Sequence, residues 1–273
     1  MSDERKRADA ALVQSGLAAS RERAQRLIVA GLATVNGTRI AKPSQRIAQG
    51  DILSVISEPH PFVSRGGLKL EKAIRTFGAS PKDLVCMDIG ASTGGFTDVL
   101  LRNGAKRVFA IDVGAGQLDA RLAADPRVKS LEHTNARALS PDMFDEQPVL
   151  AVMDVSFISI RLILPSAFAV LGDAGRMICL IKPQFEVGRS HVGKHGLVTK
   201  PEEHIRVLRE IADFAPKLGW RVRKLDYSPI TGGDGNIEFL ADMLPAALCD
   251  TTVTPRQIDE LVRLAHRADL SGR

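Results

Sequence analysis

A glycine-rich loop that directly follows an apolar run restricts the folds open to this chain. Val85–Ile89 is a short apolar run that predicts a buried strand, and Gly95–Arg102 has the residue spacing of a helix. Between them lies the loop Asp88–Phe96, which reads Asp-Ile-Gly-Ala-Ser-Thr-Gly-Gly-Phe. Small residues let the backbone approach a ligand closely, and glycine permits the tight turn from strand to helix. The succession of strand, loop and helix predicts a nucleotide-binding α/β domain.

Acidic residues around this loop indicate which ligand it holds. A dinucleotide fingerprint reads Gly-x-Gly-x-x-Gly, whereas this loop reads Asp-x-Gly-x-x-x-Gly-Gly, with an acid at the end of the strand. A second acid, Asp112, ends the next predicted strand about 20 residues further on, where ribose hydroxyls are bound. Carboxylates repel a pyrophosphate but attract a ligand that carries an α-ammonium and a sulfonium. The pattern favours S-adenosylmethionine over a dinucleotide, and a glycine-rich turn without a ligand is the alternative. The predicted cofactor residues within the loop are Asp88, Gly90, Ala91, Ser92, Thr93, Gly94, Gly95 and Phe96.

Strands and helices alternate from Val63 onward, which predicts a mostly parallel sheet covered by helices on both faces. Because prolines at 59 and 61 stiffen the chain, we expect a linker at residues 59–63. After the linker we expect a Rossmann-like domain at residues 64–250. A C-terminal helix and tail are expected at residues 251–273. The predicted strands are Val85–Ile89, Arg107–Val113, Val128–Glu132, Leu150–Asp154, Arg176–Ile181, Trp220–Leu225 and Ile237–Ala241, and the predicted helices are Gly67–Phe77, Gly95–Arg102, Ile160–Leu171, Pro201–Leu218 and Pro255–Arg267.

Residues 1–58 are a separate and basic α+β unit in the sequence. Two short helices are predicted at Ala8–Ser15 and Arg21–Ala30, and Asn36-Gly37 predicts a hairpin turn because both residues tolerate positive φ. Residues 1–82 hold 14 Lys and Arg against seven Asp and Glu, which leaves 23 against 25 in the remainder of the chain. The whole excess of positive charge therefore lies in the first third. A polyanion that docks there is the functional interpretation, and a merely soluble surface is the alternative.

This first unit resembles the αL RNA-binding motif that is shared by an S-four-type ribosomal protein, pseudouridine synthases and tyrosyl-tRNA synthetases. The resemblance rests on Arg7-x-Asp9, Gly16–Arg21, Val35-Asn36-Gly37, Lys42-Pro43 and Gly50-Asp51. Guanidinium groups gathered on one helix pair bidentately with phosphates, so we expect RNA as the partner, with a solvated helix face as the alternative. We also expect RNA contacts from an arginine near the linker. A basic glycine-rich loop at residues 188–200 is expected to close over RNA. The predicted RNA-binding residues are Arg5, Arg7, Arg21, Arg23, Lys42, Arg65, Arg189 and Lys194.

Four ionisable residues stand at informative positions of the second domain. Asp154 and Lys182 each end a predicted strand, and ligands of doubly wound sheets bind at the carboxyl ends of strands. Lys69 lies at the start of the first helix, and Glu238 lies in the run Gly-Asn-Ile-Glu-Phe. Any one of them alone could form a structural salt bridge, but four around one expected crevice predict an active site.

These residues and the glycine loop resemble the FtsJ-type ribose 2′-O-methyltransferases, which use a Lys-Asp-Lys-Glu tetrad. The closer resemblance is to the TlyA family, also named haemolysin A, whose members join an αL domain to an FtsJ-like domain. The motifs that carry this resemblance are residues 88–96, 112–118, 134–137, 154–159 and 182–188.

The resemblance implies an S-adenosylmethionine-dependent methylation of a cytidine 2′-hydroxyl in ribosomal RNA. The substrate it implies is the assembled ribosomal subunit, the large one first and the small one as a second candidate. It also implies that Lys69, Asp154, Lys182 and Glu238 are catalytic, and that Asp112, Val113, Asn135 and Asp154 complete the cofactor site.

The chemistry of such a reaction assigns a role to each residue of the tetrad. A ribose hydroxyl is a poor nucleophile at neutral pH, so the protein must place its oxygen in line with the methyl group and remove its proton. Lys182, beside a second lysine and partly desolvated, would lose its own proton more readily and act as the base. Asp154 would hold Lys182 and orient the methyl donor, while Lys69 and Glu238 would fix the ribose and balance the charge. No metal is needed.

The remaining features are typical of a cytoplasmic protein. Cys86, Cys179 and Cys249 are far apart in sequence, as expected in a reducing compartment, and the first two read as small buried thiols. No apolar run approaches the roughly 18 residues of a membrane span. His191 and His195 stand without a nearby cysteine and do not predict a zinc site. The alternative functions are a haemolysin-like membrane-active protein, an RNA- or ribosome-binding protein with an inactive methyltransferase fold, and a methyltransferase that acts on proteins or small molecules.

Overall fold

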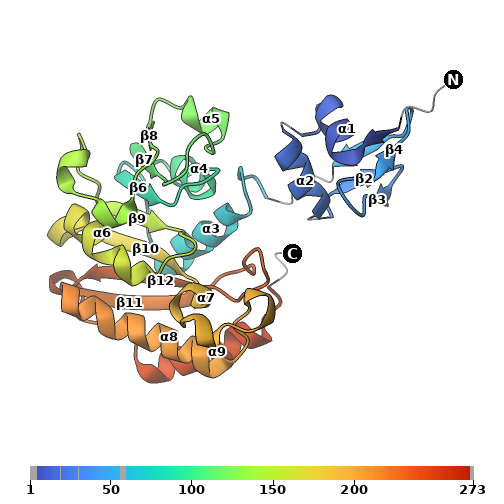
Figure 1. Cartoon of the computed structure of the whole chain (residues 1–273). Coiled ribbons are helices and arrows are strands. Elements are labelled where there is room, and N and C mark those ends of the chain that lie inside the picture. Colours follow the sequence, from blue (N-terminus) through green and yellow to red (C-terminus); the bar gives the residue numbers. More distant parts are fainter. Residues whose placement is uncertain (1–4, 19, 30, 56–59, 271–273) are drawn as a thin grey trace. The chain divides into compact units, whose positions relative to one another are not determined.

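The computed structural model describes residues 5–18, 20–29, 31–55 and 60–270, and the chain divides into two compact units (Figure 1). The first unit comprises Met1–Pro61 and the second Phe62–Arg273. Phe62 is buried in the core of the second unit, and Val63 packs against that core, so the last two residues of the predicted linker belong to the second unit. Residues 58 and 59, at the predicted boundary of the linker, lie outside the described residues.

The first unit packs two helices against small antiparallel strands. Leu12 and Leu27 of the helices meet Ile40 and Ile47 in one apolar core. The hairpin turn at Asn36-Gly37 has positive φ at both residues, 49° and 78°, as the sequence predicts. The helices are α1 (Ala8–Gln14) and α2 (Arg21–Val29), and the strands are β1 (Lys6–Arg7), β2 (Ala33–Val35), β3 (Thr38–Arg39), β4 (Arg46–Ile47) and β5 (Leu53–Val55), in which β1 pairs with β4 and the order β3-β2-β5 forms a three-stranded sheet.

The second unit is built on a seven-stranded sheet in the order β11-β12-β10-β9-β6-β7-β8. The strands from β10 through β8 run parallel, and β12 is antiparallel to both of its neighbours. The mostly parallel Rossmann-like sheet predicted from the sequence is therefore confirmed. The strands are β6 (Val85–Ile89), β7 (Arg107–Ile111), β8 (Val128–Leu131), β9 (Leu150–Met153), β10 (Arg176–Ile181), β11 (Trp220–Tyr227) and β12 (Phe239–Pro245).

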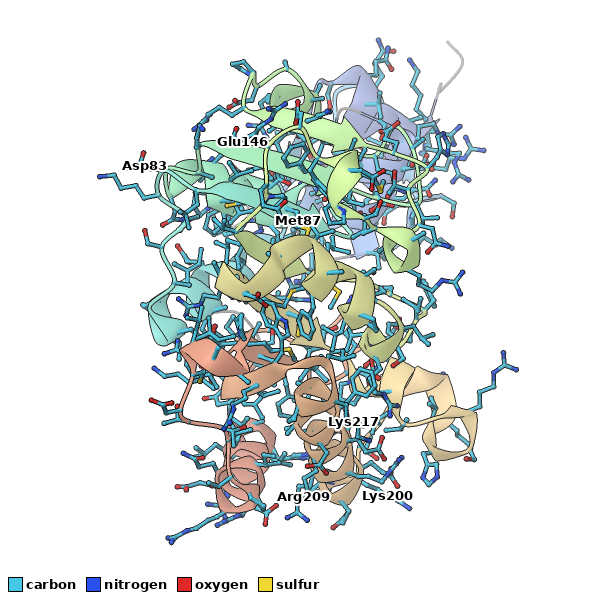
Figure 2. The ribbon with its side chains drawn as sticks, turned by 90° about the vertical axis from the view of Figure 1, so that its left-hand side faces the viewer. Asp83, Met87, Glu146, Lys200, Arg209 and Lys217 are labelled. Carbon is cyan, nitrogen blue, oxygen red and sulfur yellow. The ribbon has the colours of Figure 1, made fainter. Side chains whose placement is uncertain are left out.

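Helices cover both faces of this sheet because alternate strand residues point to opposite sides. Cys86, Val108 and Leu180 lie in one apolar core with α3 and α4, whereas Met87 and Phe109 lie in another with α6, α8 and α9. Figure 2 views the second face and shows Met87 in the sheet and Lys200, Arg209 and Lys217 around α8. The helices are α3 (Gly66–Phe77), α4 (Gly95–Arg102), α5 (Ala120–Ala123), α6 (Leu164–Leu171), α7 (Pro183–Glu186), α8 (Pro201–Phe214) and α9 (Pro255–Arg267).

The helices predicted at Ile160–Leu171 and Pro201–Leu218 are shorter than expected, and the predicted last helix is confirmed. The second of them, α8, ends at Phe214 and continues as a 3-10 turn at Ala215–Leu218. The helix expected at Ile160–Leu171 begins as a 3-10 turn at Ile160–Leu162 and becomes α6 only at Leu164, because a proline follows there at the first turn. Thr254 caps α9 by accepting a hydrogen bond from the backbone of Gln257, as its sequence predicts. No helix within the described ranges is long and apolar enough to cross a membrane.

Candidate active site

A cavity of about 520 Å³ opens at the carboxyl ends of β6, β7 and β9. This is the edge of the sheet at which ligands of doubly wound folds bind. Six of the predicted cofactor residues line it: Gly90, Ser92, Asp112, Val113, Asn135 and Asp154. The sequence did not single out other lining side chains, among them Gln117, Arg137 and Ser156.

The glycine loop reaches this cavity because Gly90 lies against the backbone of the neighbouring strand end. Gly90 has a φ of +83°, and a Cβ atom there would stand 2.5 Å from the carbonyl oxygen of Asp154. A side chain at this position would therefore push apart the two loops that form the cavity wall. Asp112 ties the same loop to β7, since its carboxylate accepts hydrogen bonds from the backbone N–H groups of Ser92 and Gly114, at 2.8 and 2.7 Å.

The other six predicted cofactor residues do not lie on the cavity wall. Phe96 is buried in the core with Val99 and Leu122, because the first turn of α4 must pack against the sheet. Thr93 contributes its carbonyl oxygen to the N–H of Asp119, which holds the next segment in place. The residues that do not line the cavity are Asp88, Ala91, Thr93, Gly94, Gly95 and Phe96.

Asp88 is a fully buried carboxylate directly below the loop. Its Oδ2 atom accepts a hydrogen bond of 2.7 Å from Thr97 Oγ1, and its Oδ1 atom has no partner among the described residues. Burial, and then the nearby carboxylates of Asp154 and Asp112, raise the pKa of Asp88 to about 7 against the opposing bond from Thr97. Three carboxylates thus make the surroundings of the cavity favourable to a cation.

The four predicted catalytic residues meet in one cluster beside the cavity. Lys182 Nζ lies 2.5 Å from Asp154 Oδ1, and Lys69 Nζ lies 2.6 Å from Glu238 Oε2 and 3.9 Å from Asp154 Oδ2. Asp154 therefore stands between the two lysines. Lys69, Lys182 and Glu238 are buried at 8%, 9% and 2% exposure, so these charges are held where water screens them little.

Four elements bring this cluster together. Asp154 directly follows β9, and Lys182 directly follows β10 as the N-cap of α7. Lys69 lies in the first turn of α3. Glu238 directly precedes β12, and the prediction that it lies inside a strand starting at residue 237 was wrong. Because β12 is antiparallel to β10, its start reaches the same edge of the sheet as the carboxyl ends of the parallel strands.

The charges in the cluster hold Lys69 in its protonated form. Burial alone would lower the pKa of Lys69, but the carboxylates of Asp154 and Glu238 outweigh it, and the pKa lies above its ordinary value. Burial raises the pKa of Glu238, against the attraction of Lys69. Lys69 is thus held as an ammonium ion between two acids, which suits it for binding and charge balance rather than for removing a proton.

Glu186 fixes the loop that carries Asp154. Its carboxylate accepts hydrogen bonds of 2.6 Å from Ser159 Oγ and 2.8 Å from the backbone N–H of Ile160. In the same loop Phe157 has a φ of 66° and is 90% exposed at the cavity wall, while its ring contacts Phe185. Glu186 and Phe157 were not predicted as site residues, although both lie inside the sequence motifs at 154–159 and 182–188.

The predicted RNA-binding residues of the second unit lie on exposed segments. Arg65 stands at the N-cap of α3, and Arg189 and Lys194 each begin a 3-10 turn. Asn236 fastens the loop that carries Lys194, since its side chain accepts from the N–H of Val198 and donates to the carbonyl of residue 196, both at 2.9 Å. The loop at residues 188–200, which is expected to close over RNA, is therefore held by Asn236 at residues 196 and 198.

In the first unit, two predicted RNA-binding arginines also support the fold. Asp9 is fully buried, and Arg7 and Arg21 lie 2.9 and 3.4 Å from its Oδ2 atom. The hydrogen bond from Arg7 holds the pKa of Asp9 well below its usual range. Arg5 and Lys42 are exposed, and Arg23 is partly exposed on α2.

Comparisons with known proteins identify both units. The profile of the FtsJ-like methyltransferase family matches residues 62–242, and the profile of the S4 domain matches residues 6–53. The chain belongs to the FtsJ-like methyltransferase family. The first of these matches contains all four residues of the charged cluster and the whole cavity wall.

Relatives across nearly the full length place the chain with TlyA and hemolysin A. It is 48% identical to the protein YqxC of Bacillus subtilis, over 88% of this chain and 86% of that one. It is 42% identical to the 16S/23S rRNA (cytidine-2′-O)-methyltransferase TlyA of Mycobacterium tuberculosis, over 86% and 88%, and 42% identical to Hemolysin A of Brachyspira hyodysenteriae, over 87% and 99%. The solved structure of a hemolysin-named protein from Streptococcus thermophilus has 45% identity and a TM-score of 0.77, and covers 97% of both chains.

The protein is thus a methyltransferase of a family whose methyl donor is S-adenosylmethionine. The preference for this donor over a dinucleotide, predicted from the acids at the strand ends, is confirmed at the level of the family. Within the part of the chain that the structure describes, no three His, Cys, Asp or Glu side chains gather as metal ligands. Cys86 and Cys179 are buried thiols in the sheet, as predicted.

Proposed function

We propose that this protein transfers the methyl group of S-adenosylmethionine to the 2′-oxygen of a cytidine ribose in ribosomal RNA. The substrate is the assembled ribosomal subunit in the cytoplasm, the large subunit and, as in the Mycobacterium tuberculosis relative named for both 16S and 23S RNA, the small subunit as well. The identity of 42% to that relative over 86% of this chain, with an S4 domain before the catalytic unit, supports this choice of substrate.

The residues of the cavity fit the methyl donor. When bound, S-adenosylmethionine supplies a methyl group that its sulfonium has already activated. Asp112 keeps two lone pairs beyond its bonds to the loop, and these suit ribose hydroxyls of the donor. Asp88, with an unpartnered and buried Oδ1 atom, and Asp154 supply the negative charge that a sulfonium and an ammonium require. Val113 and Asn135 line the same wall and would contact the rest of the donor.

The observation that carries the proposal is the ion pair between Lys182 and Asp154 at the edge of this cavity. Lys182 acts as the general base and takes the proton of the ribose hydroxyl onto its Nζ atom. Asp154 holds the amine in place and stabilises the ammonium ion that results. General bases contribute about 10² to 10⁴ in rate, which is enough to make a ribose hydroxyl a competent nucleophile.

Lys69 and Glu238 hold the substrate ribose. Lys69 keeps its proton because two carboxylates flank it, so it can donate a hydrogen bond to a ribose oxygen. Glu238 positions Lys69 through their 2.6 Å contact and offsets its charge. With Lys182 neutral, as a base must be, the four residues carry a net charge of −1, and this charge adds to those of Asp88 and Asp112 in balancing the cationic donor.

RNA docks through the basic first unit and through the exposed residues near the active site. Arg5, Arg7, Arg21, Arg23 and Lys42 contact phosphates from the first unit, and Arg65, Arg189 and Lys194 do so from the second. Because such contacts release counterions, the affinity for ribosomal subunits falls steeply as salt rises.

The test is methyl transfer by the purified protein to subunits from cells that lack this gene. With labelled S-adenosylmethionine, the wild-type protein is expected to produce 2′-O-methylcytidine, identified by mass spectrometry of the digested RNA. Lys182→Ala and Asp154→Ala are expected to abolish the product. Full transfer by these two variants, or a methyl group on a base or on protein, would refute the proposal.

A further inference from the structure

We propose that Ser156 is a positioning residue that aims the amine of Lys182 at the substrate hydroxyl. The inference rests on the proposed function, in which Lys182 is the base. It assigns a role in the reaction to a side chain outside the Lys-Asp-Lys-Glu tetrad.

Two oxygen atoms hold the Lys182 amine. Lys182 Nζ donates a hydrogen bond of 2.9 Å to Ser156 Oγ and forms the 2.5 Å ion pair with Asp154 Oδ1. Both Asp154 and Ser156 line the cavity of the methyl donor. The amine that they hold therefore lies at the edge of that cavity, in reach of a hydroxyl brought up to the donor.

The number of hydrogens on the amine makes the second acceptor decisive. A neutral lysine amine has two N–H bonds and one lone pair, in a tetrahedral arrangement. With Asp154 Oδ1 in contact with the nitrogen at 2.5 Å and Ser156 Oγ as the acceptor of one N–H, the lone pair has a single direction left. With Asp154 alone, the amine can rotate about the Cε–Nζ bond, and the lone pair faces the substrate for only part of the time.

The proton balance of the reaction is the same with and without the hydrogen bond from Lys182 to Ser156. One proton leaves the 2′-oxygen and arrives on Lys182 Nζ, which becomes an ammonium ion with three N–H bonds. Two of these remain directed at Asp154 and Ser156, and the third points back to the newly formed ether oxygen. Ser156 keeps its own hydroxyl proton throughout.

The surroundings of Ser156 argue for a role in the reaction rather than in the fold. Ser156 is exposed and lies outside any helix or strand, so removal of its hydroxyl leaves the packed core intact. The next residue, Phe157, holds a positive φ of 66°, a conformation that a bulky residue rarely adopts. The bonds from Ser159 and Ile160 to the buried Glu186 fix this unusual turn, and with it the place of Ser156.

The experiment compares Ser156→Val with Ser156→Thr, which have nearly the same shape and differ in the hydroxyl. With ribosomal subunits and S-adenosylmethionine, Ser156→Val is expected to lower kcat about tenfold and to leave the KM for subunits unchanged. Ser156→Thr is expected to retain kcat within about threefold of the wild type. Calorimetric Kd values for S-adenosylmethionine and the Tm should be the same in all three proteins.

A matched control is Ser130→Ala, which removes an exposed hydroxyl on β8 and is expected to change none of these quantities. The inference fails if Ser156→Val keeps kcat within about twofold of the wild type. It also fails if the loss follows a weaker Kd for S-adenosylmethionine, since Ser156 would then bind the donor. Absence of methyl transfer by the wild-type protein is a different result, and it refutes the proposed function itself.

Discussion

The second unit contains two clusters of buried charges at opposite ends of the same elements. At the carboxyl edge of the sheet, Lys69 of α3, Lys182 after β10 and Glu238 before β12 meet Asp154. At the other edge, Arg176 at the start of β10 meets Asp242 within β12, beside Arg223 and the last residue of α3. The two clusters share their scaffold and differ in how completely their polar atoms are bonded.

The carboxylate of the cluster around Asp242 has protein partners on both of its oxygens. Its carboxylate is fully buried and accepts hydrogen bonds of 2.7 Å from the Nε atoms of both Arg176 and Arg223. The Nη2 atom of each arginine also donates to the carbonyl oxygen of Phe77, at 2.8 and 2.9 Å. This carbonyl ends α3 and would otherwise lack a donor from its own helix, so the cluster joins a helix end to the sheet.

The cluster around Asp154 retains bonding capacity. Lys182 has three positions on its nitrogen and two partners in the described part of the chain, and it stands at the edge of a cavity. Buried charges that satisfy one another stabilise a fold, whereas buried charges that face a cavity with capacity left are available to a substrate. The comparison therefore assigns chemistry to one end of the scaffold and stability to the other.

The largest effect is expected from Lys182→Met, which removes the proposed base. We expect methyl transfer to fall by about 10³-fold, because general-base catalysis is lost, while the Tm changes little. Single-turnover kinetics with ribosomal subunits and a thermal unfolding curve measure both. Lys217→Met, at an exposed lysine, is the control. If Lys182→Met kept the wild-type kinetics but had a much lower Tm, the cluster around Asp154 would be shown to stabilise the fold rather than to catalyse the reaction.

The reverse outcome is expected for Asp242→Ala. Removal of the carboxylate leaves two guanidinium groups unpaired, so the free energy of unfolding should fall by about 3–5 kcal/mol. Denaturant unfolding measures this loss, and the rate per folded molecule should stay near that of the wild type. Asp259→Ala, which breaks a half-exposed pair with Arg209, should cost at most about 1 kcal/mol. An equal loss of unfolding free energy in both variants would show that the cluster around Asp242 contributes no more to stability than an exposed ion pair.

A third effect concerns Asp88, which is buried like Asp242 but only partly bonded. Since its pKa is about 7 without a donor, it is protonated at pH 6 and ionised at pH 8. A cationic donor favours the ionised form, so binding should release a proton, and the Kd for S-adenosylmethionine should fall about tenfold between these pH values. Calorimetry in two buffers of different ionisation enthalpy detects the proton. Asp88→Asn should bind with a Kd independent of pH, and a pH-independent Kd in the wild type would show that Asp88 plays no part.

The smallest effect is expected from Lys42→Ala in the first unit, where the charge is exposed and belongs to neither cluster. Loss of one phosphate contact should weaken binding to ribosomal subunits a few-fold and reduce the slope of log K against log salt by about 1. The free energy of unfolding should change by less than about 0.5 kcal/mol. Binding titrations at several salt concentrations test this, and an unchanged slope would remove Lys42 from the interface.

Elements with a strong local pattern were predictable from the sequence. The bounds of β6 and β10 agree with the structure because both strands are apolar except for Asp88 and Arg176, and α9 agrees because Thr254 and a proline define its start. The meeting of Asp154 and Lys182 followed from the parallel sheet, whose strands all end at one edge.

Features that depend on contacts distant in sequence were not predictable. Nothing in the local sequence shows that Asp242 lies between Arg176 and Arg223, since the three residues belong to three different strands. Half of the predicted cofactor residues do not line the cavity, because a motif marks a segment and not the side of it that faces the ligand. Ser156 stood inside a quoted motif, yet its bond to Lys182 appears only when two strand ends are brought together.

The most direct test of the account is a map of ribose methylation in ribosomal RNA from three strains: cells without this gene, and the same cells that carry either the wild-type gene or Lys182→Met. We expect 2′-O-methylcytidine at fixed positions in the strain with the wild-type gene and its absence from the other two strains. An identical methylation map in all three strains would contradict the proposed function.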